Sequence, residues 1–309
     1  MYNLRRFFYQ NRNQIIKTIA IIIFIFFIIQ MMNYFVRKNS EKETVNKNQN
    51  ITIKDEDDKG LISEKSAVTG KDVSDSKLDN ATTVINEFIS FCNQQDLEKA
   101  YNLLTNECKE QMYTSLDIFR QAYYNDVFNG EKKIFTIENW IDDTYKVNIT
   151  GDLLATGKND GYAKQDYITV KEENDQCKLN INGYIGYSNI NKKTTKDNIT
   201  MEVISKNTYK EYEEYTIKVT NNTDYELQLD SVNSTKTLYL EDSKGGKYSY
   251  YNHELTQPTL TVKQGQEKEI SIKFYSSYIS TKKIKYVVFS NIIANKGQLS
   301  EKMEFKANT

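Results

Sequence analysis

Few residues of this chain could carry out covalent chemistry. His253 is the single histidine, so a Ser–His–Asp or Cys–His nucleophile system would have to use it. It lies in the segment YYNHELTQP, which we expect to be a loop, and no Gly-x-Ser-x-Gly sequence occurs in the chain. A surface or turn histidine is therefore the favoured interpretation. A P-loop and a G-x-G-x-x-G motif are also absent, so nucleotide binding has no support in the sequence.

Metal and cofactor chemistry have equally little support. Cys92, Cys108 and Cys177 form no C-x-x-C pair, and one histidine cannot complete a zinc cluster. Cys92 and Cys108 fall on the apolar faces of expected helices, which favours small buried side chains over a disulfide. Whether these two are bonded stays open at this stage. We predict no metal site, no cofactor and no catalytic residue.

Paired carboxylates occur at two places. Asp142 and Asp143 follow Trp140, and a glycosidase needs two carboxylates across a sugar site. Neighbouring residues of a strand point to opposite faces, however, so we expect a turn at the end of a strand. The run DEDD at 55–58 lacks the spacing and turn glycine of a calcium loop, which favours a solvated charge run.

Composition excludes one class of partner. The net charge is −1 over 309 residues, so the chain lacks the overall basicity that binding to nucleic acid would favour. It has 23 tyrosines against one tryptophan, one proline and one histidine. This skew is typical of AT-rich coding sequence, as in low-GC Gram-positive bacteria, so tyrosine-rich segments such as KYSYYNHELTQ allow two interpretations. They form either a sticky exposed patch or the outer face of a sheet.

The most apolar segment predicts a membrane anchor. Residues 18–36 are uncharged and rich in Ile and Phe, and 19 helical residues at about 1.5 Å each match a bilayer core. The residues at the end of the apolar segment, QMMNYFVRKN, are bulky, so they offer no site for cleavage by signal peptidase. Four basic residues lie on each side, so the short acid-free segment 1–17 decides the orientation. We expect a cytoplasmic head (1–17), a transmembrane helix (18–36) and an extracytoplasmic remainder: a single-pass cell-membrane protein in contact with the lipid bilayer.

The remainder divides into a stalk and two domains. Residues 37–79 are polar and without a sustained period, which predicts a disordered stalk. Apolar residues then recur at helical spacing in three segments of 80–128, and the period changes to two in four segments up to 190. After a linker at 189–198, only strand patterns follow, with turns at Gly245-Gly246 and Gly265. We expect an α+β domain at 80–190 and an all-β sandwich at 198–309.

The hairpin DYITVKEENDQCKLNINGY resembles the closing strands of the nuclear-transport-factor-like family, also called the cystatin-like cone. The resemblance covers residues 80–190 and implies helices packed on a curved antiparallel sheet. It also implies a pocket between the helices and the concave face, with Phe119, Tyr123, Trp140 and Tyr145 as candidate lining residues. The domain has no histidine, which removes the commonest base of the enzymes with this fold. Aromatic residues at such positions are more often plain core.

The segments YTIKVTNNTDYELQL and LTVKQGQEKEISIKF resemble immunoglobulin-like domains of exported proteins from Gram-positive bacteria. The predicted fold class is thus a transmembrane helix, then an α+β cone domain, then an immunoglobulin-like β-sandwich. A short head, one span and an outer cone domain resemble the outer scaffold proteins of conjugative and type IV secretion systems. That resemblance implies a non-enzymatic, membrane-anchored interaction or scaffold module of the cell envelope, whose partners are envelope proteins or the chain itself. The alternative is a ligand-binding or enzymatic cone domain with the sandwich as a spacer.

Overall fold

The structure is a computed structural model that describes residues 61–63, 65–70, 73–152, 163–231, 236–251, 254–297 and 299–309. All of them belong to one compact unit of the chain, Asp57–Thr309. The predicted head at 1–17, the predicted span at 18–36 and His253 lie outside these residues. Within the described residues, buried apolar side chains gather into two hydrophobic cores.

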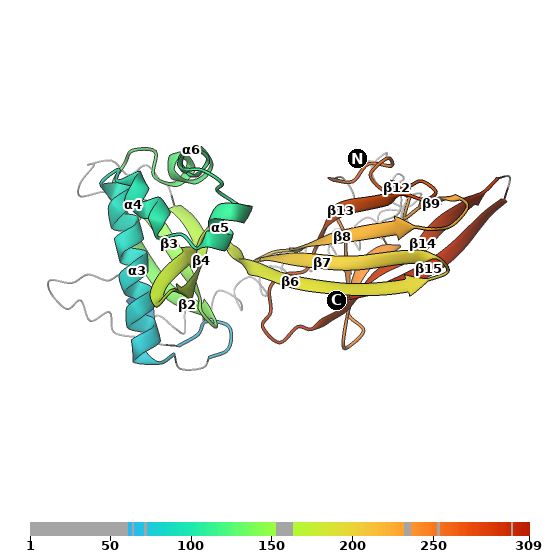
Figure 1. The fold of residues 1–309 in the computed structure, drawn as a ribbon. Coiled ribbons are helices and arrows are strands. Elements are labelled where there is room, and N and C mark those ends of the chain that lie inside the picture. The colour runs from blue at the N-terminus through green and yellow to red at the C-terminus, as the bar shows by residue number, and fades with distance from the viewer. Residues whose placement is uncertain are drawn as a thin grey trace, which may run out of the picture. The chain divides into compact units, whose positions relative to one another are not determined.

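The first core is covered by the helix α3 (Asp75–Asn93). Its buried residues recur every three or four positions, for example Leu78, Ile85, Ile89 and Cys92, so a single face of the helix is apolar. That face contacts the strands of the first sheet, along which α3 lies in Figure 1. The apolar spacing in the sequence therefore determines both the helix and the side by which it packs.

Short helices follow α3, and side-chain caps separate them. They are α4 (Leu97–Asn102), α5 (Asn106–Gln111), α6 (Leu116–Phe119), the π-helical turn η1 (Arg120–Tyr124) and α7 (Asn125–Val127). The side chains of Asp96, Thr105 and Ser115 each accept a hydrogen bond from a backbone N–H in the first turn of α4, α5 and α6. Such caps satisfy N–H groups that have no partner within the helix.

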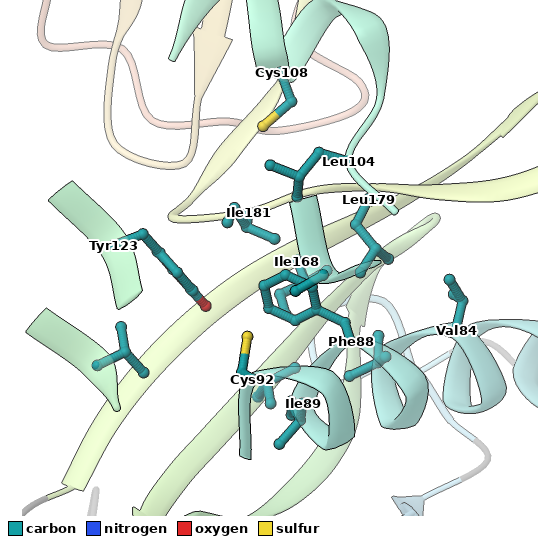
Figure 2. Close-up of a cluster of buried hydrophobic side chains, with 14 of the residues drawn as sticks. Val84, Phe88, Ile89, Cys92, Leu104, Cys108, Tyr123, Ile168, Leu179 and Ile181 are labelled. Atoms are coloured by element: carbon teal, nitrogen blue, oxygen red, sulfur yellow. The ribbon is translucent and has the colours of Figure 1, made fainter. Parts of the chain in front are cut away.

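The first sheet has the order β1-β2-β3-β4-β5. Its strands are β1 (Leu61–Ser63), β2 (Lys133–Ile141), β3 (Thr144–Gly151), β4 (Ala163–Glu173) and β5 (Gln176–Asn180). β1 pairs with β2 in parallel, and the other neighbours are antiparallel. Figure 2 shows the Phe88 ring of α3 directed toward the sheet side chain Ile168, and both residues belong to the first core together with Ile89, Cys92 and Leu179.

The second core lies between two further sheets. One has the order β13-β8-β7-β6, formed by β6 (Tyr184–Lys196), β7 (Ile199–Tyr209), β8 (Glu213–Asn221) and β13 (Glu267–Phe274). The other contains β9 (Glu226–Gln228), β10 (Leu238–Asp242), β11 (Lys247–Ser249), β12 (Thr261–Val262), β14 (Ile284–Lys296) and β15 (Leu299–Asn308). Along β8, buried positions alternate with half-buried ones, as expected for a strand with one face on a core.

Two segment boundaries differ from the sequence-based expectation. Residues 189–198, expected as a linker, form most of strand β6 and the tight turn that leads into β7. Part of the expected stalk is also ordered, because β1 pairs with β2 and α3 begins at Asp75. A polar, lysine-rich segment can form a strand when only one face of the sheet packs on a core. Composition alone therefore gave the wrong boundaries for these two segments.

The predicted fold class is wrong for the described part of the chain. About 50% of these residues form strands and about 20% form helices, and the predicted layout of a transmembrane helix followed by a cone domain is not supported. No helix in this part is long and apolar enough to cross a membrane. The longest, α3, has 19 residues but carries Asp75, Lys77, Asp79 and Glu87. The membrane and signal-anchor prediction thus has no support in the described residues, and the predicted span at 18–36 lies outside them.

We predict that Phe88→Ala lowers the free energy of unfolding by about 3–5 kcal/mol, as for other buried Phe→Ala changes. Phe88 is fully buried and its ring lies 6.2 Å from that of Phe119 and 6.0 Å from that of Tyr123. Urea unfolding followed by the fluorescence of Trp140, the single tryptophan, measures the change. The control Ile134→Ala, at a 52% exposed position, should alter it by less than about 0.5 kcal/mol. A loss for Phe88→Ala as small as that of the control would contradict the prediction.

Candidate functional site

The four aromatic residues offered as pocket lining do not line the pocket that the described residues form. Phe119, Tyr123 and Tyr145 are at most 1% exposed and belong to the first core. The rings of Phe119 and Tyr123 stack with their centres 5.8 Å apart. Trp140 is half-buried and contacts Tyr167 instead. Side chains fill the space between α3 and the sheet at these positions.

A pocket of about 280 Å³ lies at a different place, beside strand β4. Three segments and Met112 at the end of α5 form it. The segments are residues 165–167 of β4, the turn 182–183 that connects β5 to β6, and residues 209–212, from the last residue of β7 to the start of β8. Its lining residues are Met112, Gln165, Asp166, Tyr167, Asn182, Gly183, Tyr209, Lys210, Glu211 and Tyr212. Segments far apart in the sequence therefore build one concave surface.

The turn at Asn182 and Gly183 shapes one side of this pocket. Both residues have positive φ, 60° and 71°, and the N–H of Tyr184 donates to the carbonyl of Ile181. Asn-Gly is the preferred pair for such a turn because both residues tolerate left-handed backbone. The N–H of Lys210 donates to the carbonyl of Gly183 at 2.8 Å, which attaches the β7–β8 connection to the turn.

Asp166 lies at the base of the pocket and is 2% exposed. One carboxylate oxygen accepts from the Tyr123 hydroxyl at 2.7 Å and from the Asn182 N–H at 3.1 Å. The other accepts from the N–H groups of Tyr167 at 2.6 Å and Gly183 at 3.2 Å. A carboxylate has about four acceptor sites, so protein donors already use the acceptor capacity of Asp166.

The electrostatics of this group follow from its burial. Burial raises the pKa of the Asp166 carboxyl, while the Tyr123 hydroxyl, two backbone amides and the nearby Lys164 act in the opposite direction. Burial, followed by the charge of Asp166, raises the pKa of Tyr123 well above its ordinary value. The pair resembles an acid–base couple in composition, but its hydrogen bonds point into the protein. The arrangement supports a structural role for Asp166 rather than proton transfer to a ligand.

Two groups of aromatic rings meet at the pocket. In the Trp140 cluster (Trp140, Tyr167, Tyr278), Trp140 lies 4.9 Å from Tyr167 and 6.2 Å from Tyr278, measured between ring centres. Tyr167 supplies one pocket wall, and the Lys210 ammonium lies 4.0 Å from the centre of its ring. One face of Tyr167 is therefore positioned to bind a cation.

The tyrosine ladder (Tyr209, Tyr212, Tyr251, Tyr275) supplies the other wall through Tyr209 and Tyr212. Tyr209 stacks on Tyr212 at 4.2 Å, Tyr212 contacts Tyr251 at 5.9 Å, and Tyr251 stacks on Tyr275 at 3.5 Å, again between ring centres. Tyr209 is 8% exposed and Tyr275 is 51% exposed. The ladder thus connects the first core with the molecular surface.

The other chemically interesting residues do not converge on this site. In the described residues, no group of three or more His, Cys, Asp and Glu side chains could hold a metal ion. The three cysteines are free, as favoured for Cys92 and Cys108, and burial raises the pKa of the Cys108 thiol to about 12. Asp142 and Asp143 form the expected turn, where Asp142 accepts from the Tyr278 hydroxyl at 3.3 Å and Asp143 pairs with Lys77 at 2.8 Å.

The sequence did contain two signals for this site. Asp166 occupies the core-facing register of β4 together with Ile168, so an acid within the apolar alternation marked a buried carboxylate. The dipeptide Asn182-Gly183 marked the turn that binds it.

Comparisons with protein-family models, curated proteins and solved structures found no match to the chain.

We predict that Asp166→Asn destabilises the fold more than Tyr123→Phe does. The asparagine NH₂ would face donor groups whose hydrogen bonds the carboxylate now accepts. One buried polar group left without a partner costs about 1–3 kcal/mol. Tyr123→Phe removes one donor and leaves three on the carboxylate, a loss of about 0.5–1.5 kcal/mol. Urea unfolding of both variants measures the difference. Equal losses would contradict the assignment of the carboxylate as the group that binds the turn.

Proposed function

We propose that this protein is a non-enzymatic interaction module that binds a partner protein at the pocket beside β4. The observation that carries the proposal is one 280 Å³ pocket lined by Tyr167 of the Trp140 cluster and by Tyr209 and Tyr212 of the tyrosine ladder. Tyrosine and tryptophan are enriched in protein interfaces and in their energetic hot spots. Their rings are rigid and keep a polar end for water or a partner group.

The chemistry of the pocket supports binding over catalysis. Its buried acid, Asp166, has four protein donors and no acceptor site left for a substrate proton. The other charged lining groups are Lys210 and Glu211, whose side chains form an ion pair at 3.4 Å. A nucleophile beside a base is not among the lining residues.

The loop that follows β13 extends this surface. It presents Tyr275 and Ile279, each 51% exposed. Buried polar groups hold the same loop: the Ser276 hydroxyl donates to Glu213 at 2.9 Å, and the Lys282 ammonium donates to Ser276 at 2.5 Å. An apolar surface on an anchored loop loses little conformational entropy on binding, which favours a docking role.

We predict that a photo-reactive benzoylphenylalanine at position 165, in the full chain in its host, crosslinks to another polypeptide. Gln165 is exposed and lines the pocket, so the reactive group would lie against a docked partner. The same group at Gln264 serves as a matched control, because Gln264 is exposed and lies in the turn next to the far end of β8. Detection is by mass shift on a denaturing gel.

The crosslink should disappear with Tyr167→Ala, which removes one wall of the pocket. Equal crosslinking at positions 165 and 264, or a product that Tyr167→Ala leaves unchanged, would contradict a partner bound at the pocket.

A further inference from the structure

We propose that the pocket receives the guanidinium group of an arginine from the partner, at the place that the Lys210 ammonium occupies in the free chain. This inference rests on the proposed function and specifies the chemistry of its partner. Two features carry it: a cation site on Tyr167, and a neighbouring carboxylate on Glu211.

The first feature is the contact of Lys210 with Tyr167. The ammonium lies 4.0 Å from the ring centre and 3.4 Å from a carboxylate oxygen of Glu211. The ring face and the carboxylate therefore form a site for a positive charge, and the chain fills that site with its own side chain. The side chain of Lys210 is 29% exposed and that of Glu211 is 74% exposed. Ion pairs that are exposed to this degree contribute little to stability. Replacing the Lys210 ammonium by another cation therefore costs little free energy.

The backbone of Lys210 is held independently of its side chain. Its N–H donates to the carbonyl of Gly183, and its carbonyl accepts from the N–H of Tyr278, both at 2.8 Å. The ammonium can thus leave Tyr167 without movement of the β7–β8 connection. The pocket wall would keep its shape when the cation is exchanged.

The charge of the lining also favours a cationic ligand. Asp166 and Glu211 are acidic and Lys210 is basic, so the lining carries one more negative than positive group. Since the acceptors of Asp166 are used, Glu211 is the carboxylate that can turn to a ligand. An anionic ligand could pair only with Lys210 among the lining residues, and it would lie near the negative charge of Glu211.

Arginine fits this pair of groups better than lysine does. Its planar guanidinium stacks on an aromatic face and at the same time donates two parallel hydrogen bonds to a carboxylate. Tyr167 offers the face and Glu211 offers the carboxylate. A partner arginine would therefore displace Lys210 by making both contacts with one rigid group.

The test is selection of a random-peptide display library on the full chain, followed by affinity measurements on the enriched peptides. We expect enriched peptides to contain arginine, and replacement of that arginine by its neutral analogue citrulline to weaken binding about tenfold. Glu211→Gln should weaken binding similarly. Lys210→Gln should instead strengthen it several-fold, because the competing ammonium is gone.

Lys263→Gln is the matched control for Lys210→Gln. Lys263 is exposed and lies near the far end of β8, so this change should leave the affinity unaltered. A merely structural role of Lys210 predicts unchanged or weaker binding for Lys210→Gln, and either result would overturn the inference. Circular dichroism confirms that the variants are folded.

The outcomes separate the two proposals. Peptides without arginine whose binding is still lost in Tyr167→Ala would overturn the arginine site and leave the interaction module standing. The absence of any peptide whose binding depends on Tyr167 would overturn both.

Discussion

The hydrogen bonds of the Asp166 carboxylate connect the elements that enclose the first core. They join the hydroxyl of Tyr123, which belongs to the helical layer, to strand β4 and to the turn at 182–183. That turn leads directly into β6, the first strand of the four-stranded sheet. A buried carboxylate is costly unless donors surround it, so the positions of helix, strand and turn depend on one another.

The pocket is a consequence of this connection. Once the turn is bound to Asp166, the carbonyl of Gly183 accepts from Lys210 and holds the β7–β8 connection over β4. Tyr167 and Tyr209 then face the same space from different strands. The carboxylate oxygens of Asp166 already accept hydrogen bonds from the protein. The groups that can contact a partner are therefore the aromatic rings and the exposed ion pair. These groups favour recognition over reaction.

A second buried charge group holds the loop at the edge of this surface. Glu213, at the start of β8, binds Lys206 at 3.1 Å and Ser276 at 2.9 Å. Lys282 completes the group, and burial lowers its pKa. Such networks stabilise a fold weakly compared with apolar packing but restrict it to one arrangement when every member is bonded. Glu213 directly follows Tyr212, so the same short segment carries the pocket wall and the anchor of the loop.

The local elements were determined by the sequence itself. The apolar spacing of α3, the caps Asp96 and Ser115 and the alternation along β8 follow from contacts within a few residues. The family resemblance offered Phe119, Tyr123, Trp140 and Tyr145 as pocket lining, although such aromatic residues are more often core. The structure places the first two and Tyr145 in the core. Only the tertiary structure decided that Asp166, Lys210 and Glu211 meet, because hydrogen bonds between residues 166, 183 and 210 join segments that no local pattern relates.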